Sequence, residues 1–228
     1  MRNIYSYIIS FTLAFAVHSL NAQEKDKKIS DFTKTLFLNG ITVQADIASL
    51  ATTVLTNAER YSFEGGVQID LKHKFYPVVE VGFAGANKLS LSDIRFNTNG
   101  LYGRIGVDFN LLKQKKDTKP TNNLFLAGLR LGMTHFNYNI SNILVTDDYW
   151  GESHVIDYNN EPSTKIWFEV VAGIRVEVLK NIYMGWSVRN KNLITQDVSG
   201  KPSPWYIPGF GQNNTTNWGV SYTIGYKF

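Results

Sequence analysis

The densest group of side chains that could do chemistry lies near the middle of the chain. Five carboxylates and one imidazole stand between residues 147 and 161: Asp147, Asp148, Glu152, His154, Asp157 and Glu161. Carboxylate oxygens are hard ligands, so this group could hold a divalent cation. The calcium-loop pattern needs a glycine at its turn position, and these acids have none at that spacing. We therefore expect a solvated acidic loop and no metal site.

A second set of charged side chains is spread over segments in which apolar and polar residues alternate. Its members are Asp46, Glu64, Asp70, Glu80, Arg104, Asp108, Arg130, Glu169, Arg175, Glu177 and Arg189, with Lys72. Buried charges persist only when they are paired and hydrogen-bonded. If the polar faces of these segments meet in one interior, we expect a salt-bridge network that fills it. A charge-lined pore is the alternative.

The segments that carry these charges have the period-2 pattern of β-strands. Eight strands are predicted, at residues 37–54, 60–72, 76–86, 100–112, 124–136, 164–179, 182–189 and 216–228. Long polar connections at 87–99, 137–162 and 190–216 alternate with shorter ones at 73–76, 113–123 and 180–181. An even strand number with long connections at one end and short ones at the other is typical of a membrane-spanning barrel.

The last strand has the strictest alternation and ends at the last residue of the chain. Large side chains occupy one face: Trp218, Val220, Tyr222, Ile224, Tyr226 and Phe228. This strand resembles the closing strand of bacterial outer-membrane barrels. The resemblance implies that Trp218, Tyr222, Tyr226 and Phe228 form the signal read by the barrel-assembly machinery, and that the protein lies in the outer membrane among lipids that include lipopolysaccharide. The Ala22-Gln23 junction and the terminal Tyr226-Lys227-Phe228 look like the small uncharacterised barrels common in Bacteroidota.

Alternation alone does not decide which face points inward. A soluble lipocalin-like carrier would enclose Ile166, Phe168 and Val170 around a cavity, although the Gly-x-Trp start of that family is missing. A membrane barrel would turn the same residues to lipid, because an arginine at the bilayer midplane costs about 2–4 kcal/mol. The aromatic terminus and the glycines on the polar face favour the membrane barrel.

An enzyme is a further alternative. His135 falls on the apolar face near the end of its strand, which invites comparison with barrel lipases that cut lipopolysaccharide acyl chains. Those enzymes place a serine two residues from the histidine, and here Asn137 stands in that position. Without a nucleophile, His135 is expected to be an interfacial side chain. The acidic loop also differs from outer-membrane proteases, which use ten strands and split their acid pairs between loops.

Composition sets the remaining expectations. The chain has 228 residues, a formal net charge of +4 and no cysteine. Residues 1–22 are predicted to be a signal peptide, with a basic start, an apolar core and a small residue at the cut, and residues 23–36 a polar periplasmic leader. The basic run from Lys113 to Lys119 lacks interleaved aromatics, so nucleic acid is not an expected partner.

Taken together, these patterns predict an all-β, eight-stranded antiparallel up-and-down transmembrane β-barrel over residues 37–228. We expect a monomer without cofactor or enzymatic activity, with exposed loops that carry aromatic residues. Those aromatics are Tyr138, Tyr149, Trp150, Tyr158, Trp205, Tyr206 and Phe210.

Overall fold

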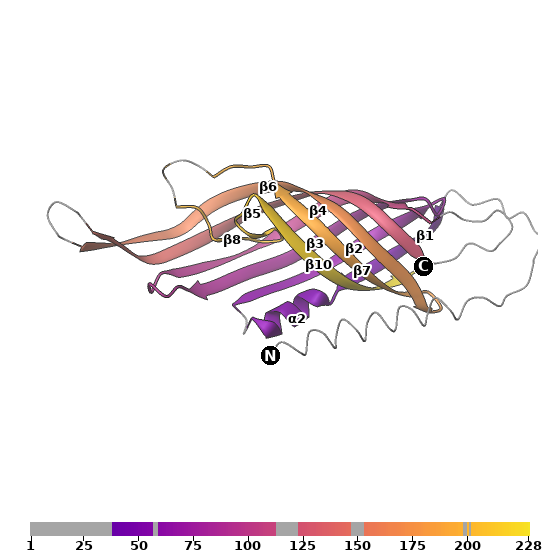
Figure 1. Cartoon of the computed structure of the whole chain (residues 1–228), viewed down its shortest axis with the longest axis horizontal. Helices are drawn as coiled ribbons and strands as arrows, with labels where there is room; N and C mark the ends of the chain where they lie inside the picture. Colours follow the sequence, from indigo (N-terminus) through magenta and orange to yellow (C-terminus); the bar gives the residue numbers. More distant parts are fainter. Residues whose placement is uncertain (1–37, 57–58, 113–122, 147–152, 198–199, 201) are drawn as a thin grey trace, which may run out of the picture. The chain divides into compact units, whose positions relative to one another are not determined.

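The computed structural model describes residues 38–56, 59–112, 123–146, 153–197, 200 and 202–228. Its wall strands are β1 (Leu38–Asp46), β2 (Arg60–Leu71), β3 (Phe75–Leu89), β4 (Arg95–Asn110), β5 (Leu124–Thr146), β6 (Ser153–Leu179), β7 (Ile182–Leu193) and β10 (Thr216–Lys227). These eight form a closed barrel in the order β1-β10-β7-β6-β5-β4-β3-β2 (Figure 1). Every neighbouring pair is antiparallel, which confirms the predicted fold class.

The first and last strands close the barrel. Thr42 of β1 pairs with Lys227 of β10, and Asp46 pairs with Thr223. Tight turns join β2 to β3 and β6 to β7, and Lys72, His73 and Asn181 there have φ angles between 52° and 67°. Left-handed residues match the twist of short hairpin turns. The chain therefore reverses at these points within a few residues, as the sequence predicts.

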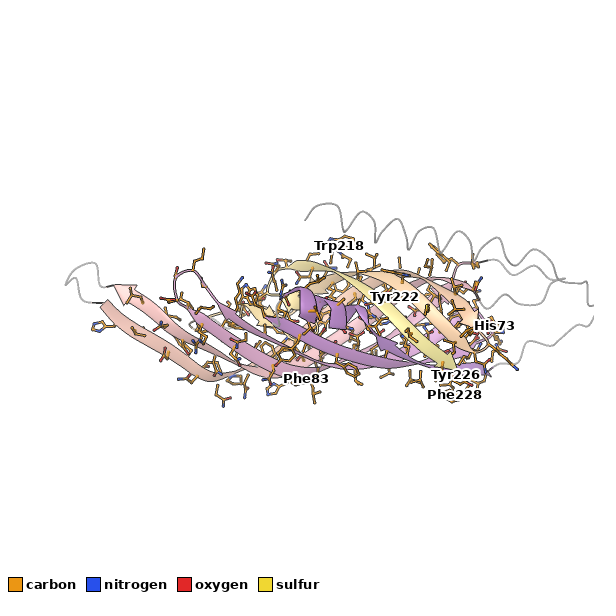
Figure 2. All side chains as sticks on the ribbon, turned by 90° about the horizontal axis from the view of Figure 1, so that it is seen from below. His73, Phe83, Trp218, Tyr222, Tyr226 and Phe228 are labelled. Carbon is orange, nitrogen blue, oxygen red and sulfur yellow. The ribbon has the colours of Figure 1, made fainter. Side chains whose placement is uncertain are left out.

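The outer surface of the barrel is apolar. Phe63, Val81, Leu101, Leu129 and Val170 are all exposed, and Trp218 keeps 73% of its surface accessible. Figure 2 shows Trp218, Tyr222, Tyr226 and Phe228 along β10. Phe168 and Val170 also point outward, so the carrier alternative, which needs them around a cavity, is wrong.

The hairpin of β5 and β6 is much longer than expected. A polar loop was expected at 137–162, but β5 continues to Thr146 and β6 begins at Ser153. Figure 1 shows this hairpin extending past the ends of the other strands. Cross-strand pairs such as Leu144 with Val155 hold it together, with register shifts on either side of Ile140. Near its tip the adjacent residues Leu144 and Val145 are both exposed, so both faces of the hairpin are accessible there and polar side chains are compatible with a strand.

The first predicted strand is wrong in its second half. Strand β1 ends at Asp46, and residues Ala48–Leu55 form the helix α2. The Asp46 carboxylate accepts a hydrogen bond from the Ala48 N–H at 2.9 Å, and the Ser49 hydroxyl donates to the Asp46 carbonyl at 3.0 Å. These local bonds turn the backbone away from the ladder, because short polar side chains compete with strand pairing.

A segment of the last long connection folds inward. Strands β8 (Tyr206–Ile207) and β9 (Gly211–Gln212) form a small hairpin. Tyr206, Ile207 and Phe210 are buried, with Phe210 only 1% exposed. They pack in one apolar cluster with Phe96, Tyr102, Phe136, Tyr138 and Trp167. The expectation that Tyr138, Tyr206 and Phe210 lie on exposed loops is therefore wrong.

Several expectations concern residues that the structure does not describe. They are the signal peptide at 1–22, the leader at 23–36, the basic run 113–119, and Asp147, Asp148, Tyr149, Trp150 and Glu152. In the described part of the chain, no helix has the length and apolar character needed to cross a membrane.

Candidate functional site

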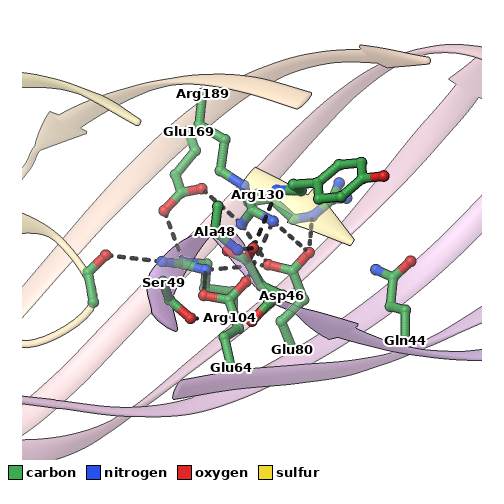
Figure 3. Close-up of polar contacts among 12 residues, drawn as sticks. Gln44, Asp46, Ala48, Ser49, Glu64, Glu80, Arg104, Arg130, Glu169 and Arg189 are labelled. Carbon is green, nitrogen blue, oxygen red and sulfur yellow. Dashed lines mark hydrogen bonds and ion pairs between the residues drawn. The ribbon is translucent and has the colours of Figure 1, made fainter. Parts of the chain in front are cut away.

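The lumen of the barrel contains a compact cluster of charged side chains. One residue comes from each of six strands: Glu64, Glu80, Arg104, Arg130, Glu169 and Arg189. All six are buried (Figure 3). Their positions follow from strand register, which pairs Glu80 with Arg104 and Arg130 with Glu169.

Glycines on neighbouring strands make room for these long side chains. Gly82 stands opposite Glu64, and Gly106 stands opposite Arg130. A Cβ added at Gly106 would lie 2.6 Å from Cδ of Arg130. An eight-stranded barrel has an interior just wide enough for side chains, so small residues must stand beside large ones.

Two arginines share the three glutamates. The Arg104 guanidinium pairs with Glu64 and lies 3.3 Å from Glu80 and 2.8 Å from Glu169. The Arg189 guanidinium lies 3.3 Å from Glu64, 2.7 Å from Glu80 and 3.5 Å from Glu169. Each buried glutamate thus faces at least two arginines, an arrangement that offsets the desolvation of both signs.

Arg130 joins Asp108 to the cluster. Its two terminal nitrogens donate to the two Asp108 carboxylate oxygens, each at 2.8 Å, in the bidentate geometry that suits guanidinium. The Gln68 amide donates to the same carboxylate at 2.6 Å. Gln68 was not singled out from the sequence, although its place on the polar face of a predicted strand was an available signal.

The inward hairpin covers the charged cluster. The Gly209 carbonyl accepts hydrogen bonds from Arg104 at 2.8 Å and from Lys191 at 2.7 Å. Gly209 has a φ of 79°, and a side chain there would meet the Tyr102 ring. Lys191 and Gly209 were expected in an outer loop at 190–216, and no local pattern predicts that this loop enters the lumen.

The remaining predicted charges lie apart from the cluster. Asp46 accepts backbone hydrogen bonds from Ala48 and from Tyr222. Asp70 pairs with Lys227 at 2.7 Å and with His73 at 2.8 Å, near the turn between β2 and β3. Glu177 accepts a hydrogen bond from the Asn181 N–H at the β6–β7 turn. Arg175 donates to the Gln44 amide oxygen at 3.1 Å.

His135 has a hydroxyl neighbour that the sequence did not reveal. Strand pairing sets Thr164 opposite His135, and the Nδ1 of His135 lies 2.8 Å from the Thr164 hydroxyl on the outer surface. Spacing along one strand could not reveal this contact, because His135 and Thr164 lie on neighbouring strands, at the adjoining ends of the predicted segments 124–136 and 164–179. Among the described residues, no group of histidines and carboxylates is arranged to hold a metal ion.

The expected terminal signal residues lie on the outer surface or its edge. Trp218, Tyr226 and Phe228 are exposed, and the rings of Tyr226 and Phe228 meet edge to face with centroids 4.8 Å apart. The Tyr222 ring lies 4.5 Å from the Trp186 ring on β7. Large aromatic groups thus follow β10 along the barrel wall.

Comparisons with known proteins give a family, and distant barrels are among the solved structures that match. A family described as a domain of unknown function (DUF6048) matches residues 4–228. No curated protein matches. The N-terminal β-barrel domain of Pseudomonas aeruginosa OprF is 11% identical over 83% of this chain and 98% of that one, with a TM-score of 0.38. Neisserial surface protein A is 12% identical over 82% of this chain and 97% of that one, with a TM-score of 0.37.

Proposed function

The chain belongs to the family described as a domain of unknown function (DUF6048), and we propose that it is a non-enzymatic outer-membrane barrel with a closed lumen. Its outer connections serve structural or surface-interaction roles. Outer-membrane lipids, including lipopolysaccharide, surround its wall, and the barrel-assembly machinery reads Trp218, Tyr222, Tyr226 and Phe228. The resemblance to barrels common in Bacteroidota remains a prediction.

One observation carries this proposal: the wall is apolar outside while the charges inside pair with one another. Leu129 and Val170 are exposed, whereas Arg130 and Glu169, their neighbours in sequence, are buried in contact with partners of opposite charge. Apolar residues outside and charged residues inside are the reverse of the arrangement in a soluble barrel, and they suit a barrel in lipid, which needs apolar groups outside. The inward hairpin lies over the ion pairs, so two layers of side chains occupy the lumen and favour a plug over a pore.

The test is expression of the full chain in a Gram-negative bacterium, followed by fractionation and reconstitution. We expect the protein in the outer-membrane fraction, with faster gel migration before boiling than after it. In planar bilayers the purified protein should give no steady conductance. Recovery of folded protein in the soluble periplasm would contradict the membrane assignment, and a stable conductance would contradict the closed lumen.

A second candidate function, ester hydrolysis at the outer leaflet, is favoured only by the contact between His135 and Thr164. A histidine that accepts a hydroxyl proton can activate it as a nucleophile. Among the described residues, no carboxylate is hydrogen-bonded to His135 to orient its ring. This makes a cross-strand polar pair at the edge of the apolar wall the better supported interpretation.

Deacylation of lipopolysaccharide or phospholipid by the reconstituted barrel would test this candidate. His135→Ala and Thr164→Val should each abolish a genuine activity, whereas His154→Ala, on the same hairpin, should not. Absence of turnover in the wild-type protein eliminates the candidate and leaves the first proposal intact.

A further inference from the structure

Arg175 is a buried cation without a contacting anion. Its side chain comes from β6 into the lumen, and the residue is only 7% exposed. A guanidinium carries five N–H donors, yet its one hydrogen bond within the described part of the chain goes to the neutral Gln44 amide. No carboxylate oxygen of a described residue lies within the 4.0 Å of an ion pair, unlike those around Arg104, Arg130 and Arg189.

A cavity of about 40 Å³ lies beside Arg175. Arg130 and Arg189 share its wall, together with the side chains of Gln44, Ser187 and Thr223. Amide and hydroxyl groups can donate hydrogen bonds, so most of the polar groups on this wall suit an anion.

The acids on the same wall are already committed to other partners. Asp108 is held at both oxygens by Arg130 and at one also by Gln68. Glu80 is held by Arg189 and Arg104. Asp46, elsewhere in the lumen, accepts two backbone N–H groups. The positive charge of Arg175 is therefore the one on this wall without direct compensation.

We propose that this cavity binds a small monovalent anion of the chloride class, held by Arg175. A volume of about 40 Å³ exceeds the space that one water requires, about 10–15 Å³, and so admits a halide. A single negative charge matches the single uncompensated guanidinium, whereas a divalent oxyanion would place surplus charge beside Glu80 and Asp108. The anion would remove the cost of an isolated buried cation.

Arg175 also lines a second, smaller cavity that reaches the end of the barrel. Its wall includes Tyr76, His73 and Lys227, residues at or near the β2–β3 turn and the last strand. Asp70 also lines this cavity and is paired there with Lys227, so Arg175 is the cation of this wall that has no contacting acid among the described residues. The inference goes beyond the proposed function, because a closed lumen could exist with or without a bound anion.

The experiment measures urea unfolding of the full-length barrel from lipid vesicles, in sodium chloride and in sodium gluconate at equal ionic strength. The folding equilibrium constant should rise by a factor of 1 + [Cl⁻]/Kd, about tenfold when chloride is ten times its Kd. Arg175→Gln should remove the difference between the two salts. Arg95→Gln, the same change at an exposed arginine on β4, should retain it.

Crystals grown in sodium bromide give an independent measurement if Arg175→Gln does not fold. An anomalous peak in the cavity beside the Arg175 guanidinium supports the site. Equal unfolding in the two salts for the wild-type protein, or bromide only on the outer surface, overturns the proposal. Either negative result leaves the outer-membrane assignment and the closed lumen untouched.

Discussion

Glu80 is the acid that contacts three of the lumen arginines. It lies within 4.0 Å of Arg104, Arg130 and Arg189 and is 2% exposed. Glu80→Gln keeps the shape but leaves buried guanidinium charge less compensated, and removal of one member of a buried pair typically costs about 3–5 kcal/mol. We expect a loss of that size in the free energy of unfolding, measured by urea titration in vesicles. Glu59→Gln, at an exposed glutamate, should change stability little.

Asp197, which lies outside the strands of the barrel wall, should make the stability of the protein depend on pH. Burial raises the pKa of Asp197, but hydrogen bonds from Lys165, Ser203 and Asn213 outweigh it, so the pKa lies below its usual value. A lowered folded-state pKa contributes stability that is present above the unfolded pKa, about 3.9, and is lost as pH falls through the folded pKa.

The corresponding experiment compares unfolding of the wild-type protein and Asp197→Asn between neutral pH and about pH 3. The wild type should have the larger free energy of unfolding at neutral pH. The difference between the two proteins should become smaller below about pH 4, as Asp197 becomes protonated. Asp93→Asn, at an exposed turn, serves as the control. If the difference in unfolding free energy stayed constant down to the lowest pH measured, the contact with Lys165 would not depend on the charge of Asp197.

At the scale of elements, the inward hairpin should stabilise the barrel, but the lumen should stay closed to ions without it. Replacing residues 203–212 with a short Gly-Ser linker removes Ile207 and Phe210 from the apolar cluster. Each buried apolar side chain of this size contributes about 1.5–3 kcal/mol, so the unfolding free energy should fall by several kcal/mol. The ion pairs beneath remain, and planar bilayers should still show no steady conductance. A stable open channel would mean that the hairpin alone closes the lumen.

The wall strands could be predicted from local sequence, because the alternation of apolar and polar residues is visible between neighbours in the chain. The same local pattern identified the tight turns, predicted at 73–76 and 180–181, and the polar residues that the register brings together. It missed α2, because the apolar residues of 48–55 fit either a strand or a helix, and the hydrogen bond from the Ala48 N–H to the Asp46 carboxylate depends on one side chain. It also missed the inward path of Gly209, which depends on Arg104 and Lys191 from distant strands.

The sites that sequence could not assemble are those made across strands. Thr164 approaches His135 through the register of β5 against β6, which local sequence does not fix. Likewise, the pattern of alternation placed the charged residues on the inner face of the predicted strands. It did not show that Arg175 would contact the neutral side chain of Gln44 in place of a carboxylate. Register and the identity of opposing residues therefore decide which polar groups of the wall meet.

At the scale of the whole molecule, the apolar exterior predicts that the effect of a charged substitution depends on its position: it should be destabilising where the wall lies in lipid and nearly neutral where the wall lies outside it. Leu129 lies on the outer face of β5, between Val107 and Val170 of the flanking strands, and is exposed. Leu129→Arg should cost about 2–4 kcal/mol near the bilayer midplane and reduce the amount of folded, heat-modifiable protein. Leu144 is also exposed, but it lies beyond Ser141, the last residue of β5 that pairs with β4, on the part of the β5–β6 hairpin that has no described strand beside it on the β4 side. Leu144→Arg should therefore leave stability in vesicles nearly unchanged, since its side chain already faces water. Equal effects of the two substitutions would mean that the surface around Leu129 does not lie in lipid.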